Sequence, residues 1–275
     1  MLRQRVVTAL VLVLLVVGVL FWGSQTAWAL LTLPVLGLAL WEWCRLLSRS
    51  WIVPLLISLT AAGAYHLYRA DLSAPPGWVV PLLLVGLLAW LLVAVPSVFK
   101  ARPSAGSSVW LACLCLFNLW LALYEFRVAG PWVLLSVMAI VWLADTGAYF
   151  AGRSLGRHKL APKVSPGKTW EGVAGGIVLV CVVAWLLTQH GTLPADAIFS
   201  SAIARHVGMA GMMWLLALIV MVSVLGDLYE SLLKRAAGVK DSSQVLPGHG
   251  GVFDRIDALV PAMPLCLLIW ILMLP

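Results

Sequence analysis

Long apolar runs separated by short polar stretches fill almost the whole chain. A transmembrane helix needs roughly 20 apolar residues, and the pattern therefore predicts an all-α polytopic membrane protein of about nine spans. Gly and Pro residues lie between the runs, where helix breakers belong. The predicted spans cover about residues 5–22, 26–47, 51–69, 78–96, 107–124, 131–151, 172–190, 208–233 and 258–274.

Composition supports lipid as the main solvent. Of the 275 residues, 63% are hydrophobic and 11% charged, whereas soluble domains are about half apolar and about a quarter charged. The Cys residues all lie in apolar runs without a CxxC pair, which predicts core packing rather than a disulfide framework or a zinc site. They are Cys44, Cys113, Cys115, Cys181 and Cys266.

The distribution of Lys and Arg predicts an orientation. If the N-terminus is cytosolic, only three of the 18 Lys and Arg residues, Arg69, Arg127 and Arg205, fall in outer loops. The positive-inside rule then places the N-terminus in the cytosol and, with nine spans, the C-terminus outside. The net charge of +7 is spread among loops, which favours a membrane surface and phosphorylated substrates over nucleic acid.

The first apolar run has a second interpretation. Arg3 and Arg5, the run itself and Ala27-Trp28-Ala29 together resemble a cleavable signal peptide. The run exceeds the usual length of about 7–15 residues, and further spans follow at once, so we favour a retained helix.

Polar residues concentrate between positions 145 and 257, so we divide the chain into N-terminal spans of unassigned chemistry, 1–130, and a catalytic region, 131–275. Ionisable residues within spans are costly and indicate function. Asp145 shares a helix face with Tyr149 and Arg153. The structural alternative for this face is an intrahelical Asp145–Arg153 pair.

A second polar group closes the eighth span. Four residues fall on one face of a helix. They supply two carboxylates, one hydroxyl and one amine, which together can hold a hard cation and a phosphate. They are Asp227, Glu230, Ser231 and Lys234. Interfacial snorkelling explains Lys234 and Arg235 but leaves Asp227 unexplained.

A third group lies before the ninth span. Gly250 and Gly251 predict a turn that opens this helix and points free N–H groups at an anion. Asp254 and Asp257 follow near the helix start, and His249 lies beside the glycines. A plain helix-capping turn is the alternative.

The long loop after the sixth span supplies Lys159, Lys163 and Lys168. Gly167-Lys168-Thr169 looks like the end of a P-loop, but the required earlier glycine is Pro162, and we expect no strand before it. We therefore reject the P-loop and keep Lys168 as a phosphate ligand. Acids for Mg²⁺, bases for phosphate oxygens and backbone N–H groups for pyrophosphate together predict a phosphotransfer enzyme at the membrane surface.

These residues resemble the phosphatidate cytidylyltransferase (CDP-diacylglycerol synthase) family. The C-terminal signature matches without a gap at Ser231, Lys234-Arg235, Lys240-Asp241, Pro247, His249-Gly250-Gly251, Asp254-Arg255 and Asp257. Residues 145–152 and 165–172 also look like family motifs, except that Gly167 replaces a more usual polar or basic residue. The resemblance covers about 145–257, and we assign no chemistry to residues 1–130.

The resemblance implies an all-helical membrane fold, CTP and phosphatidic acid as substrates, and Mg²⁺ as the cofactor, with a second cation left open. It makes Asp227 and Asp254 the metal ligands, and we add Asp145 as a third. The remaining expected catalytic residues are Lys168, Ser231, Lys234, Arg235 and His249. The expected nucleotide-binding residues are Lys168, Lys240, Gly250, Gly251 and Arg255.

We expect the enzyme in the inner membrane of a bacterial cell, with its site facing the cytoplasm; a homodimer is left open. A CTP-dependent lipid kinase would need the same groups but would release CDP instead of pyrophosphate. A transporter would place its acids near mid-bilayer, and we find no internal repeat. The pattern of the CDP-alcohol transferases is absent.

Overall fold

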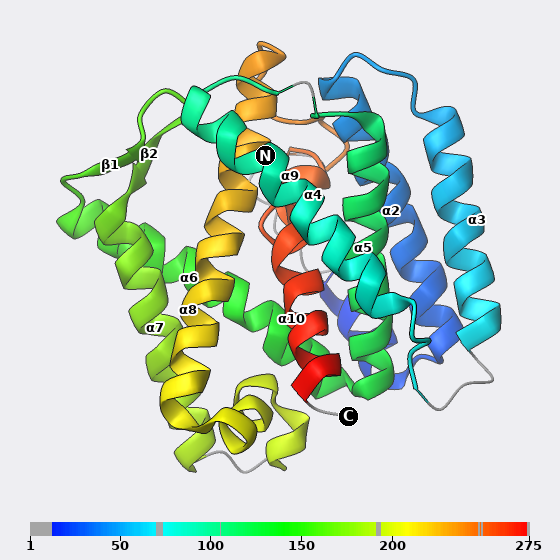
Figure 1. Cartoon of the computed structure of the whole chain (residues 1–275), viewed down its shortest axis with the longest axis vertical. Helices are drawn as coiled ribbons and strands as arrows, with labels where there is room; N and C mark the ends of the chain where they lie inside the picture. Colours follow the sequence, from blue (N-terminus) through cyan, green and yellow to red (C-terminus); the bar gives the residue numbers. More distant parts are fainter. Residues whose placement is uncertain are drawn as a thin grey trace.

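The computed structural model describes residues 13–69, 74–104, 106–190, 194–246, 248 and 250–273. Almost all of this part is helical (Figure 1). The helices are α2 (Gln25–Leu46), α3 (Ile52–Arg69), α4 (Val79–Lys100), α5 (Val109–Ala129), α6 (Pro131–Leu155), α7 (Trp170–His190), α8 (Phe199–Ala236), α9 (Phe253–Ile256) and α10 (Leu259–Met273). An apolar helix, Val13–Trp22, precedes α2, and a 3-10 turn, η1 (Ala195–Ala197), precedes α8.

The predicted apolar runs fall on helices wherever the structure describes them. Six helices, α2 and α4 to α8, are long and apolar enough to cross a membrane, which agrees with a polytopic membrane protein. Val13–Trp22 and α10 are shorter, so the count of nine spans stays a prediction. Polar caps fix helix starts, because Ser24 and Ser108 accept the free N–H groups of Ala27 and Leu111.

The eighth predicted span, 208–233, belongs to a longer element. α8 begins at Phe199 and is broken at Gly208, whose φ of 73° and ψ of 172° lie outside the helical region. Residues 199–203 at its start are buried, including the polar Ser200 and Ser201, whereas residues 205–208 are exposed. Glycine at position 208 lets the chain change direction without strain.

A short β-hairpin corrects our expectation that no strand lies in the long loop. β1 (Lys159–Ala161) pairs antiparallel with β2 (Ser165–Thr169), which carries Lys168 and leads directly into α7 (Figure 1). Glu171 closes the base of the hairpin by accepting the N–H groups of Arg157 and His158. Lys168 therefore lies in a strand, so the P-loop remains rejected.

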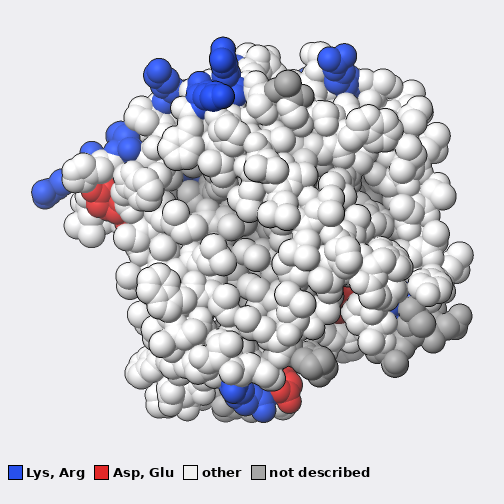
Figure 2. All heavy atoms as spheres, in the orientation of Figure 1, with Lys and Arg blue, Asp and Glu red and all other residues white. Residues whose placement is uncertain are grey.

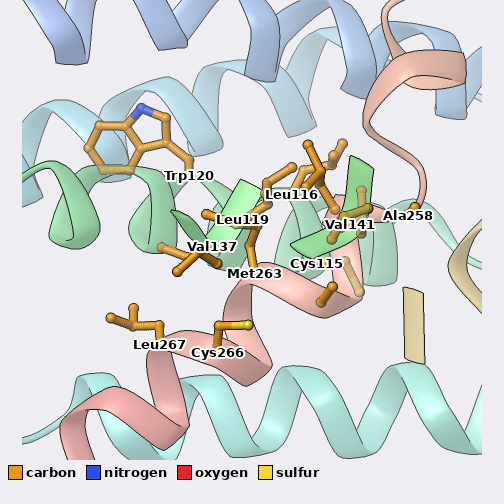
Figure 3. Close-up of a cluster of buried hydrophobic side chains, with 14 of the residues drawn as sticks. Cys115, Leu116, Leu119, Trp120, Val137, Val141, Ala258, Met263, Cys266 and Leu267 are labelled. Carbon is orange, nitrogen blue, oxygen red and sulfur yellow. The ribbon is translucent and has the colours of Figure 1, made fainter. Parts of the chain in front are cut away.

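The core is centred on α10, which is enclosed by α4, α5, α6 and α8. Figure 3 shows side chains of α5, α6 and α10 meeting there, including Cys115, Trp120, Val137, Met263 and Cys266. This enclosure explains how a helix of 15 residues can be apolar on every side. All five cysteines are free, as predicted.

Small residues bring α6 and α7 into close contact. A Cβ atom added at Gly176 would lie 2.7 Å from the carbonyl oxygen of Ala144, and one added at Gly147 would lie 2.7 Å from that of Gly175. Backbones approach this closely only where side chains are absent. The contact fixes the hairpin, and with it Lys168, against the helix that carries Asp145.

We predict that Gly176→Ala lowers the unfolding temperature in detergent, because an overpacked interface costs about 1–3 kcal/mol. The control is Gly63→Ala on α3, where an added Cβ meets nothing within 4 Å. That change should leave the unfolding temperature unchanged or raise it slightly, since Ala favours a helix over Gly. Equal effects of the two variants would contradict the close α6–α7 contact.

Candidate functional site

The predicted site residues come together at one end of the bundle. The hairpin, the C-terminal end of α8 and α9 all lie toward the upper end in Figure 1. In Figure 2 most of the visible Lys and Arg atoms gather along that same edge and on the hairpin. The apolar bundle thus carries its polar chemistry at one surface.

A first ion pair joins β2 to α8. Lys168 Nζ lies 2.5 Å from Asp227 Oδ2, and Ser231 Oγ donates to Asp227 Oδ1 at 3.3 Å. Asp145 of α6 interacts electrostatically with both Lys168 and Asp227. The alternative of an Asp145–Arg153 pair is wrong, because Arg153 donates instead to the Tyr149 hydroxyl at 2.8 Å.

A second ion-pair group joins α8 to α9. Lys234 Nζ lies 2.5 Å from Glu230 Oε2 and 2.7 Å from Asp254 Oδ1. The Lys234 side chain is only 14% exposed, so it points inward and does not snorkel. The polar residues that close the eighth predicted span therefore meet Asp254, which lies on the separate short helix α9 before the ninth predicted span.

The glycine turn before α9 corrects one prediction. We expected free N–H groups for an anion, but Gly251 N–H donates to Asp254 Oδ2 at 2.7 Å. The N–H groups of Val252 and Phe253 donate to the two carboxylate oxygens of Glu42, at 3.0 and 2.6 Å. Two protein carboxylates thus take the place that we had assigned to a substrate anion. Gly250, with a φ of +83°, forms the turn.

Glu42 lies at the same end of the bundle as the predicted site residues but was not predicted to belong to them. It lies near the C-terminal end of α2, is fully buried, and is flanked by Trp41 and Trp43. An acid inside an apolar run was a signal for function, but we applied that rule only after position 145. The chain's first 130 residues therefore contribute a polar group to this end of the molecule.

The other predicted site residues are less enclosed. Arg235, Lys240 and Arg255 are exposed, and Gly250 is half-buried. His249 and Pro247 lie outside the residues that the structure describes.

Known proteins resemble this chain over nearly its whole length. The cytidylyltransferase family matches residues 3–273, nearly the entire chain. The chain belongs to the cytidylyltransferase family. It is 38% identical to the phosphatidate cytidylyltransferase of Haemophilus influenzae, with 96% of each chain covered. It is 35% identical to that of Pseudomonas aeruginosa, over 98% of this chain and 97% of the relative.

Two acids at this end of the bundle have opposite pKa shifts. Burial raises the pKa of Asp254, but hydrogen bonds from neighbouring side chains, including Lys234, and from Gly251 N–H outweigh burial and hold it well below its usual range. Burial and the nearby Asp227 carboxylate raise the pKa of Asp257 to about 8. The protonated form of Asp257 is therefore favoured over a wider pH range than that of an exposed aspartate.

The acids suit a cation that arrives with a nucleotide. Within the described residues, no three His, Cys, Asp or Glu side chains form a ready metal cluster. Asp227 nevertheless interacts electrostatically with both Asp145 and Asp257, and a cation would relieve this repulsion. Mg²⁺ usually takes only one or two protein carboxylates and completes its shell with substrate phosphates and water. The donor set therefore fits Mg²⁺.

The raised pKa of Asp257 predicts a pH dependence of stability in metal-free detergent. The contribution of Asp257 to the free energy of unfolding is complete below the pKa of its unfolded state, about 3.8. That contribution is lost as pH rises toward the folded-state pKa of about 8. The unfolding temperature should therefore fall by several degrees between pH 5 and pH 8, and Asp257→Asn should flatten that fall. Asp254, with a lowered pKa, is fully ionised throughout this range. An equally steep fall in Asp257→Asn would contradict the assignment.

Proposed function

We propose that this chain transfers the CMP group of CTP to phosphatidic acid, giving CDP-diacylglycerol and pyrophosphate. The observation that carries the proposal is the pairing of Lys168 with Asp227 and of Lys234 with Asp254 at one end of an apolar bundle. Acids and bases are concentrated where a charged nucleotide can meet a lipid headgroup. Relatives named phosphatidate cytidylyltransferase match over nearly their whole length, which supports the same reaction.

Asp227, Asp254 and Asp145 are the proposed Mg²⁺ ligands. The cation, when bound, neutralises the charge of the triphosphate and polarises the reacting phosphoryl group. Lys168 and Lys234 already lie against these acids. We assign them to phosphate oxygens, with Ser231, Arg235, Lys240, His249 and Arg255 as further contacts.

The proposed reaction is a direct displacement. A phosphate oxygen of phosphatidic acid forms a bond to the α-phosphorus of CTP, while the bond from that phosphorus to the bridging oxygen breaks. The electron pair leaves with pyrophosphate. Phosphatidic acid is already ionised at neutral pH, so no strong general base is needed, and catalysis consists of positioning and charge neutralisation.

An apolar cavity beside the hairpin suits the acyl chains of the lipid. It has a volume of about 510 Å³ and lies among α4, the hairpin and α8. Lys163, Val164 and Trp170 line it next to Lys168, and Leu225 and Leu228 line it next to Asp227. A lipid lying there would bring its phosphate to the ion pairs.

We further propose nine spans, a cytosolic N-terminus, an external C-terminus and a site that faces the cytoplasm of a bacterial cell. The gathering of Lys and Arg at the site end in Figure 2 supports this orientation, because positive loops remain on the cytosolic side.

Purified protein with labelled CTP, phosphatidic acid and Mg²⁺ should release pyrophosphate, whereas release of CDP would indicate the lipid kinase instead.

Asp227→Ala and Asp254→Ala should each lower turnover by roughly 100-fold or more, because such charge stabilisation is a large part of phosphoryl transfer. Lys168→Ala should raise the KM for CTP, and Lys159→Ala on the exposed strand β1 is its control. Full activity in either Asp variant, with the protein still folded in detergent, would refute the metal assignment.

The cavity assignment has its own test. Leu225→Trp should raise the KM for phosphatidic acid several-fold and leave the KM for CTP unchanged, because the larger side chain fills space proposed for an acyl chain. Leu218→Trp, on the exposed face of the same helix, is the matched control. Equal KM values for phosphatidic acid in the two variants would exclude the cavity as the lipid site.

A further inference from the structure

Glu42 is a buried carboxylate that the proposed reaction does not use. Its side chain is 0% exposed on α2, and no ion pair of Glu42 is present among the described residues. A buried charge is tolerated only where hydrogen bonds or counter-ions replace water. The partners of Glu42 therefore show what it holds in place.

Among the described residues, the hydrogen-bond partners of Glu42 all come from two ends of one distant loop, Ser242–Ser243 and Val252–Phe253. Oε1 accepts from Ser243 Oγ at 2.5 Å and from Val252 N–H, and Oε2 accepts from Phe253 N–H. Ser242 Oγ lies 3.1 Å from Glu42 Oε2 and 3.0 Å from Asp254 Oδ2, so it stands between the two carboxylates. Glu42 on α2 thus accepts hydrogen bonds from both ends of this loop.

The loop backbone lies very close to the Glu42 carboxylate at Gly251. A Cβ atom added at Gly251 would lie 2.5 Å from Glu42 Oε1 and 2.0 Å from Ser242 Oγ, so only glycine fits there. Next to Glu42, the Trp43 ring stacks on Phe253 with centroids 4.8 Å apart, and it also contacts Tyr229 of α8. The end of α2 is therefore packed against α9 and α8 together.

The same loop orients Asp254. Asp254 Oδ2 accepts from Ser242 N–H at 3.0 Å and from Gly251 N–H at 2.7 Å, which turns Oδ1 toward Lys234. Glu42 does not contact Lys234 or Lys168, and it reaches the ion pairs only through this loop. The geometry points to Glu42 as a positioning residue, a carboxylate clamp that holds Ser242–Ser243 and Val252–Phe253 together so that Asp254 meets Lys234.

The clamp is tested by comparing Glu42→Gln with Glu125→Gln. Gln keeps the size of Glu but replaces one acceptor oxygen with an NH₂ donor, which faces the donors of the loop. Glu125 is the matched control, because it is also a buried acid but pairs with Arg69 and Tyr65, away from the loop. Amide hydrogen exchange is measured by mass spectrometry on the peptide covering 242–257, and kcat and unfolding temperature are measured in parallel.

We expect Glu42→Gln to speed exchange in this peptide at least tenfold and to lower kcat at least tenfold. Glu125→Gln should change neither, even where its unfolding temperature falls equally. Unchanged exchange in Glu42→Gln would overturn the clamp, and faster exchange with unchanged kcat would overturn the positioning role. If Glu42→Gln does not fold, Ser243→Ala, which removes one donor, should give smaller changes in the same direction, and no change would overturn the inference.

The turnover part rests on the proposed function, whereas the exchange part does not. Failure of the wild-type protein to make CDP-diacylglycerol would end the proposed function. The exchange comparison would still decide whether Glu42 holds the loop.

Discussion

Carboxylates buried in an apolar bundle have to find donors or cations within the protein, because lipid offers neither. This constraint organises the polar end of the molecule. Glu230 and Asp254 share Lys234, and Glu42 accepts from backbone N–H groups and hydroxyls of the loop before α9, while the partly exposed Asp227 pairs with Lys168. Except for Glu230 and Lys234, which lie on the same helix, these pairings join elements that are distant in the sequence. The contacts that give these carboxylates their hydrogen-bond and ion-pair partners therefore also bring the elements of the site together.

The helices supply the rigid frame for these pairings. α10 is buried among its neighbours, and Asp257, which lies just before α10, interacts electrostatically with Asp227 on α8. The glycines of α6 and α7 allow the backbones to approach, which places the hairpin and Lys168 over α8. Apolar packing thus sets the distances, and the charged side chains complete the contacts.

The proposed reaction needs a place where a charged nucleotide and a lipid meet. The ion pairs lie at one end of the bundle, and an apolar cavity of about 510 Å³ adjoins the hairpin that carries Lys168. Polar and apolar compartments side by side suit a substrate with a phosphate head and two acyl chains.

The sequence by itself determined the helical membrane architecture, the approximate helix positions and the stretches that carry Lys168, Asp227 and Asp254. Those features depend on the length of apolar runs and on spacing within one element, which are local properties. Only the tertiary structure decided that Glu42 holds the glycine turn, that Lys168 lies in a strand and that α8 begins before its break at Gly208. Hydrogen-bond partners some 200 residues apart are set by packing, and no periodicity in the chain encodes them.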